Sequence, residues 1–217
     1  MSEKEKMINA QPYAPFDEQL VKERQNCKKM CFEYNNISPE NLEEREKLLR
    51  KLLGKTAKSF LIEQNFYCDY GYNIEIGENF YSNHNLVILD PAKVTFGDNV
   101  FIGPNCGFYS ARHPLDYKER ITFIEDAKPI KVGDNVWFGG NVTVLAGVTI
   151  GSNTVIGAGS VKGIYACQYK EVYSNGKTLN CAIPMQNLKS TAGAINSGSH
   201  EALFEDYVEN GVCELSE

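Results

Sequence analysis

Three histidines, His84, His113 and His200, are the side chains of this sequence whose ordinary pKa lies near neutrality. His113 stands in the segment Tyr-Ser-Ala-Arg-His-Pro-Leu-Asp, and the proline after it favours extended backbone at the histidine. An imidazole placed there can take a proton from a hydroxyl group during a transfer reaction. Most surface-loop histidines have no catalytic role, so the residue by itself marks only a candidate general base.

The cysteines give little support to metal chemistry. The chain has seven of them, an odd number without a Cys-x-x-Cys pair. Cys27 and Cys31 lie one helical turn apart, but two thiols without further ligands do not form a zinc site. The pattern is typical of reduced thiols in a cytosolic protein, so we expect a cytoplasmic location and no metal.

Composition excludes several other classes of function. The net charge is −6 with acidic and basic residues interspersed, so we expect no nucleic-acid partner. The sequence has no apolar run of membrane-spanning length, and residues 1–16 lack the apolar region of a secretory signal. A chain of 217 residues suits one domain with a small appendage.

The part of the chain that must position a catalytic side chain such as His113 is dominated by a six-residue repeat over residues 130–161. It reads IKVGDN VWFGGN VTVLAG VTIGSN TVIGAG SV, with an apolar residue at every sixth position. These residues are Val132, Phe138, Val144, Ile150 and Ile156. A period of six fits neither a helix nor a simple strand, and indicates a short strand plus a corner. Most of these positions precede a glycine, which tolerates positive φ or close backbone approach. The repeat predicts a parallel β-helix.

The same lattice continues upstream through Phe96, Ile102 and Phe108, and residues 111–129 interrupt it. A loop of this length inside a repeat is usually functional, and we expect it to leave the coil and cross toward another subunit.

Residues 13–53 predict two helices that cover the open end of the coil. Asp17 suits the N-cap of the first, and Ser38 followed by a proline suits the start of the second. The second helix should bury a stripe formed by Leu42, Leu49, Leu52 and Leu53.

Residues 10–161, with the hexads and the segments YAPFDEQLVKER and FYSNHNLVILD, resemble the hexapeptide-repeat acyltransferases, in particular the maltose and galactoside O-acetyltransferases. The resemblance implies a mainly β fold, a left-handed parallel β-helix that assembles as a homotrimer. It also implies acetyl-CoA as donor and a sugar hydroxyl as acceptor. It divides the chain into an N-terminal helical segment (1–58), the β-helix (59–161, with the excursion loop 111–129) and an atypical tail (162–217).

The matching histidine of that family is the catalytic base, so the resemblance assigns this role to His113. It places Asn83 beside the acetyl and sugar groups, where it or a backbone N–H can stabilise the oxyanion. Glu125 matches an acidic position that orients the imidazole, and a solvated carboxylate is the competing interpretation.

Three aspartates match acceptor-binding positions of the family. Asp69 and Asp90 lie in segments that resemble it, CDYGYNI and NLVILD. Asp17 can reach the sugar site or cap a helix, and the sequence favours neither role over the other.

The donor would lie along the coil wall, where the resemblance points to five residues: Trp137, Gly139, Gly140, Ala158 and Lys162. Small residues at a corner leave room for an extended pantetheine arm. Packing between coils requires small residues at the same places, so this explanation stays open.

The resemblance stops after Val161, and no arginine follows Arg120. Either a change of reading frame near Lys162 or a tail acquired for another purpose explains the difference. The residues from Ser190 onward are rich in Ser, Gly and Ala and then acidic, so we expect them to be loosely ordered. Two alternatives to sugar acetylation remain: another acceptor, such as a xenobiotic or serine, or a non-catalytic trimeric β-helix. A γ-type carbonic anhydrase needs three metal-binding histidines on the coil. His200 lies in the tail and cannot join His84 and His113, so we discard this kind of metal catalysis.

Overall fold

The structure is a computed structural model that describes residues 1–163, 169–172, 178–181 and 213–216. It has two compact units, residues 1–162 and 163–217. In the second unit, strands β17 (Tyr169–Val172), β18 (Thr178–Cys181) and β19 (Cys213–Ser216) form an antiparallel sheet. The tail residues expected to be loosely ordered, from Ser190 onward, lie mostly outside the described residues.

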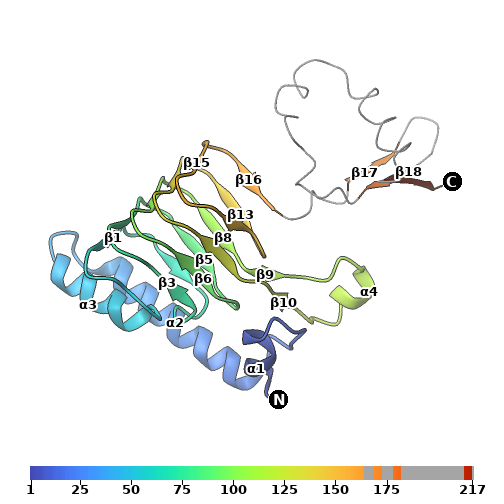
Figure 1. Cartoon of the computed structure of the whole chain (residues 1–217). Coiled ribbons are helices and arrows are strands. Elements are labelled where there is room, and N and C mark those ends of the chain that lie inside the picture. The colour runs from blue at the N-terminus through green and yellow to red at the C-terminus, as the bar shows by residue number, and fades with distance from the viewer. Residues whose placement is uncertain (164–168, 173–177, 182–212, 217) are drawn as a thin grey trace. The chain divides into compact units, whose positions relative to one another are not determined.

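The first unit is built around three parallel sheets that form the sides of a coil (Figure 1). One side contains β1 (Phe60–Ile62), β4 (Phe80–Ser82), β7 (Phe101–Ile102), β12 (Trp137–Phe138) and β15 (Val155–Ile156). The second contains β2 (Tyr67–Cys68), β5 (Val87–Leu89), β8 (Gly107–Tyr109), β13 (Thr143–Leu145) and β16 (Val161–Lys162). The third contains β3 (Ile74–Glu75), β6 (Val94–Phe96), β11 (Ile130–Val132) and β14 (Thr149–Ile150). Successive strands pass from side to side, which confirms the predicted parallel β-helix.

The interior of the coil is filled by the residues of the six-residue lattice. Phe138 and Val144 have no exposed surface, and Ile156 is 5% exposed. An aromatic column crosses the coils, with ring centroids 5.0 Å apart for Phe96 and Phe108 and 5.2 Å apart for Phe108 and Phe138. The column takes one ring from each of three successive coils, so buried residues of the repeat carry the packing between coils, as the repeat predicts.

The corners depend on asparagine as much as on glycine. Asn135 has a φ of 56°, and its side-chain amide donates to Asn153 Oδ1 at 3.0 Å and accepts from Asn99 at 3.0 Å. Gly133 does not have positive φ, but a Cβ there would lie 2.5 Å from Ser152 Oγ. Of the two predicted reasons for glycine, close approach of neighbouring coils is the one that holds at this lattice position.

Helices α2 (Glu18–Asn36) and α3 (Leu42–Leu52) lie at one end of the coil (Figure 1). Asp17 caps α2 as predicted, with Oδ1 accepting the Gln19 N–H at 3.0 Å. The predicted start of the next helix at Ser38 is wrong, because the Asn41 N–H bonds to the Ser38 carbonyl in a turn and α3 begins at Leu42. Leu42 is consequently 58% exposed and not part of the apolar stripe. A further short helix, α1 (Glu3–Ile8), was not predicted.

The helices share one hydrophobic core with the first coils. Arg45 of α3, 4% exposed, donates to the Ile62 carbonyl at 2.9 Å and to Glu63 at 3.0 Å. The predicted covering of the open coil end is therefore confirmed. No helix among the described residues is long and apolar enough to span a membrane.

The excursion loop leaves the coil after β8 and returns at β11. Its base is an antiparallel pair, β9 (Ala111–Arg112) and β10 (Asp126–Ala127), and its tip carries α4 (Tyr117–Arg120). Figure 1 shows this loop extending away from the coil wall. Its large apolar side chains are exposed: Leu115, Tyr117, Ile121, Phe123 and Ile124.

Candidate active site

The base of the excursion loop places His113 beside Glu125. Arg112 and Asp126 face each other across the β9–β10 pair, and the guanidinium forms a bidentate ion pair at 2.9 and 2.5 Å. His113 directly follows β9 and Glu125 directly precedes β10, and His113 Nε2 lies 3.7 Å from Glu125 Oε1. At this distance the two groups form an ion pair when the imidazole is protonated, but they are too far apart for a hydrogen bond. The side chain of His113 is 61% exposed.

The N-terminal segment holds Glu125 from the other side. The Tyr13 hydroxyl donates to Glu125 Oε2 at 2.9 Å, and the two residues exchange backbone hydrogen bonds at 2.9 and 3.1 Å. Burial, and then the neighbouring carboxylate, raises the pKa of the Tyr13 phenol, so that it remains a donor. Phe16 and Phe123 pack edge to face at 5.7 Å. Asp17, next to Phe16, caps α2 with its carboxylate, which confirms the cap and leaves a sugar contact as a prediction.

Asp69 and Asp90 belong to the same corner of the coil as the excursion loop, since both follow strands of the second side. Asp90 is fully buried, and its Oδ1 accepts the N–H groups of Asp69 and Tyr70 at 3.0 and 2.9 Å. Burial raises the pKa of Asp90 to about 7. Asp69 is half-buried; burial raises its pKa, and Arg24 opposes that shift. Asp90 therefore supports the turn that presents Asp69.

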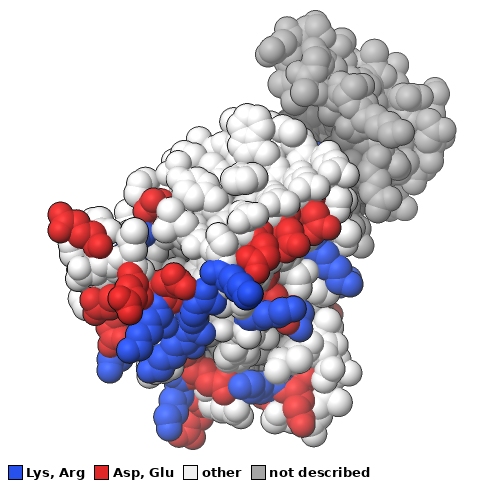
Figure 2. All heavy atoms as spheres, turned by 60° about the vertical axis from the view of Figure 1, so that its left-hand side comes forward, with Lys and Arg blue, Asp and Glu red and all other residues white. Residues whose placement is uncertain are grey.

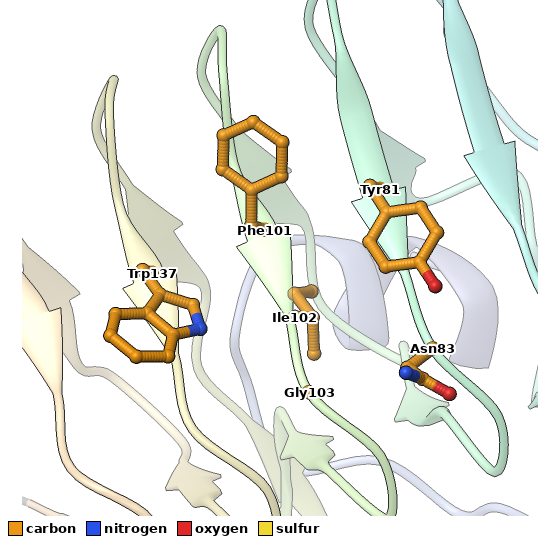
Figure 3. Close-up of a pocket in the computed structure, with 6 residues that line it drawn as sticks. All are labelled: Tyr81, Asn83, Phe101, Ile102, Gly103 and Trp137. Atoms are coloured by element: carbon orange, nitrogen blue, oxygen red, sulfur yellow. The ribbon is translucent and has the colours of Figure 1, made fainter.

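A groove of about 460 Å³ lies elsewhere, on the outer face of the first side of the coil. It is lined by Tyr81, Asn83, Phe101, Ile102, Gly103 and Trp137. Figure 3 shows three aromatic rings on successive strands facing the same way, with Asn83 and Gly103 toward one end. Register explains the row, since Tyr81 pairs with Phe101 and Phe101 with Trp137. Phe101 and Trp137 are 45% and 56% exposed.

The predicted site residues thus form two groups at different corners. His113, Glu125, Asp69 and Asp90 follow strands of the second side or belong to the loop between the second and third sides. Asn83, Gly139, Gly140 and Ala158 follow strands of the first side, Trp137 lies on it, and Lys162 lies on β16 of the second side. Within one chain the structure brings each group together but not the two groups with each other.

The residues predicted along the donor path lie in stacked coils. A Cβ on Gly139 would lie 2.6 Å from the Ala158 N atom, so packing between coils accounts for that glycine. Gly140 is less confined, since a Cβ there would be 3.3 Å from the Pro104 carbonyl oxygen. Ala158 and Lys162 are exposed near the last described coil.

The sequence matches known families over both of its characteristic parts. Residues 6–57 match the maltose acetyltransferase hexapeptide capping motif, and residues 129–161 match the bacterial transferase hexapeptide (six repeats). A putative acetyltransferase of Saccharomyces cerevisiae is 52% identical over 148 residues, which cover 68% of this chain and 76% of that protein. The chain belongs to the hexapeptide-repeat acetyltransferases.

Two solved structures support the same assignment. A maltose O-acetyltransferase from Clostridium difficile 630 has a TM-score of 0.73 and 50% identity, covering 74% of this chain and 86% of that chain. A hexapeptide-repeat-containing acetyltransferase from Vibrio cholerae, solved with acetyl coenzyme A, has a TM-score of 0.68 and 39% identity, covering 75% and 88%. The coil of this acetyltransferase is therefore the left-handed parallel β-helix of its family, and the predicted acyltransferase class and fold are confirmed.

Sequence reasoning missed three features of this acetyltransferase's site. Tyr13 holds Glu125 across 112 positions of sequence. Arg24 donates to the Tyr70 hydroxyl at 2.6 Å, beside Asp69. Phe101 completes the aromatic row of the groove. The one available clue was for Phe101, since Phe101 and Trp137 are aromatic residues at the same point of hexads that lie in successive coils.

Proposed function

We propose that this acetyltransferase transfers the acetyl group of acetyl-CoA to a sugar hydroxyl, with His113 as general base, in sites shared between the protomers of a homotrimer. The observation that carries the proposal is the separation of the two residue groups. The base and its carboxylates occupy one corner of the coil, and the groove with Asn83 occupies another. A complete site then requires two protomers, each contributing a different corner.

Exposed apolar surface supports the assembly. The excursion loop exposes Leu115, Ile121 and Phe123 by 68%, 68% and 65%. On the coil, Trp137 and Val155 occupy paired positions and are 56% and 65% exposed. Figure 2 shows charged side chains of both signs gathered on part of one face, next to a broad area that carries neither. Exposed apolar side chains such as those of the loop, Trp137 and Val155 are typical of a protein–protein interface.

The mechanism follows from the groups at the two corners. Neutral His113 accepts the proton of the acceptor hydroxyl as its oxygen attacks the thioester carbonyl. Asn83 or a backbone N–H donates to the oxyanion of the tetrahedral intermediate. Collapse expels the CoA sulfur, which takes the proton back from the imidazolium. Glu125, fixed by Tyr13, stabilises the imidazolium at 3.7 Å.

The acceptor side suits a polyol. Asp69 lies within electrostatic range of Glu125 and next to the turn held by Asp90, so its carboxylate can accept hydrogen bonds from sugar hydroxyls. Asp17 is joined to the loop side through the Phe16–Phe123 contact. The capping-motif match and the similarity to a maltose O-acetyltransferase support a sugar over another alcohol. The donor arm would pass Trp137, Gly140 and Ala158 toward Lys162.

A thiol-release assay with acetyl-CoA and a panel of mono- and disaccharides tests the proposal. We expect His113→Ala to lower turnover by roughly 10²- to 10⁴-fold, the usual contribution of a general base. His84→Ala is the matched control, because His84 is an exposed coil histidine that bonds to Asn83 through its backbone N–H and not through its side chain, so this variant should retain activity. Equal turnover in the two variants would remove His113 from the mechanism.

A non-catalytic trimeric β-helix is the second candidate, favoured by the end of the hexads at Val161 and by Lys162 as the only cation assigned to the donor path. Titration with acetyl-CoA separates the two functions. A folded trimer that binds no acetyl-CoA would support the non-catalytic protein, whereas binding without turnover on sugars would point to a different acceptor.

A further inference from the structure

Three buried thiols meet where α2 packs on the first coil. Cys27 and Cys31, one turn apart on α2, face Cys68 of β2, and the three are 2%, 1% and 6% exposed. The Cys68 sulfur lies 3.4 Å from the Cys27 sulfur and 3.8 Å from the Cys31 sulfur. All three sulfur atoms lie within 4.8 Å of one another. Cys68 supplies the third ligand that the spacing of Cys27 and Cys31 could not reveal.

The spacing of the sulfur atoms fits a shared metal ion. With metal–sulfur bonds of about 2.3 Å, three thiolates around one ion lie roughly 3.8 to 4.0 Å apart. The observed separations of 3.4 and 3.8 Å differ from this by a few tenths of an ångström. Small rotations of the side chains can therefore open the ligand set without moving α2 away from the coil.

The surroundings favour a cation. Asp90 has no exposed surface, and its Oδ2 has no hydrogen-bond partner among the residues that the structure describes. Its carboxylate lies within electrostatic range of Cys27 and Cys68. Buried negative charge is costly unless it is paired or near a metal ion. A monovalent cation among the three sulfur atoms would offset one of the thiolate charges and would attract the neighbouring carboxylate.

We propose that Cys27, Cys31 and Cys68 form a three-coordinate site for a thiophilic monovalent ion of the Cu(I) type. Thiolate ligands select Cu(I) and zinc among common ions. Structural zinc is almost always four-coordinate, and no fourth Cys, His, Asp or Glu joins this group among the residues that the structure describes. Binding releases the protons of the three thiols to solvent and involves no redox change of the ion.

The test is a competition titration of the reduced full chain, under nitrogen, with Cu(I) held by bicinchoninate. We expect the chain to withdraw one equivalent of copper and both Cys68→Ser and Cys31→Ser to lose that equivalent. Cys106→Ser, a buried cysteine elsewhere in the coil, is the matched control and should keep it. A triple variant with serine at Cys167, Cys181 and Cys213 should also keep it.

X-ray absorption of the copper-loaded chain should show three sulfur neighbours at about 2.3 Å. Circular dichroism checks that each serine variant folds. If a variant does not fold, the X-ray absorption spectrum of the copper-loaded, unmutated chain still shows how many sulfur atoms bind the copper. Four outcomes would overturn the proposal. They are copper retained by folded Cys68→Ser, copper lost in the tail triple variant, stronger retention of zinc than of Cu(I), and a Cys27–Cys68 disulfide with no copper uptake after reduction.

Discussion

Asp90 connects burial at the proposed acceptor corner to a measurable pH dependence. Its carboxyl group is fully buried, and burial raises its pKa from an ordinary 3.8 to about 7. Between these values the folded chain holds the proton while the unfolded chain has released it. Because the folded state binds more protons there, the free energy of unfolding falls as pH rises from about 4 to about 7.

The size of this loss follows from the shift. A rise of about 3 pKa units corresponds to at most about 4 kcal/mol of stability, all of it lost above about pH 7. Asp90→Asn carries no charge and keeps an oxygen that can accept the N–H groups of Asp69 and Tyr70. We therefore predict that its stability changes much less than that of the unmutated chain between about pH 5 and 8.

The assay is urea unfolding at one protein concentration across that pH range, with midpoints and slopes compared between variants. Asp98→Asn is the matched control, because Asp98 is an exposed coil aspartate that accepts the Glu78 N–H at 2.8 Å. Its pH profile should follow that of the unmutated chain. The same pH profile in Asp90→Asn and the unmutated chain would refute the reasoning, since the buried carboxyl would then not be the titrating group.

Two further predictions concern the coil and the loop. Gly133→Ala should cost about 1–3 kcal/mol of stability, because its Cβ would lie 2.5 Å from Ser152 Oγ. A Cβ on Gly151 would meet no atom of the described residues within 4 Å, so Gly151→Ala should be near neutral. Equal melting temperatures of the two variants would contradict this. Tyr13→Phe removes the hydrogen bond to Glu125 and should lower kcat by up to about tenfold, with little change in the KM for acetyl-CoA. An unchanged kcat would exclude a role for Tyr13 in positioning Glu125.

The fold was largely predictable because its buried positions repeat. Phe138, Val144 and Ile156 occupy the same point of successive hexads and are buried for the same reason. The role of the corner residues was only partly predictable, since a Gly-Asp-Asn or Gly-Ser-Asn corner contains two residues that tolerate unusual backbone. The local sequence does not say that asparagine takes the positive φ and glycine the close contact.

The site was predictable only where local sequence carried it. His113 stood out through its rarity and its proline. Glu125 was predicted only through the family resemblance, and Tyr13, which holds Glu125, was missed because no periodicity relates residues so far apart. Cys68, which joins the α2 thiols, was missed for the same reason. The corner occupied by each group follows from the strand order, which becomes visible only once the coils are assembled.

The central claim is that one protomer supplies His113 and its neighbour supplies Asn83. Co-expression of His113→Ala and Asn83→Ala chains with two different tags, followed by tandem purification and the thiol-release assay, tests it directly. After tandem purification every trimer contains both chains, and one of its three sites has both residues intact, so activity should recover to about a third of that of the unmutated enzyme. Mixed trimers no more active than the two parent variants would contradict a site shared between protomers.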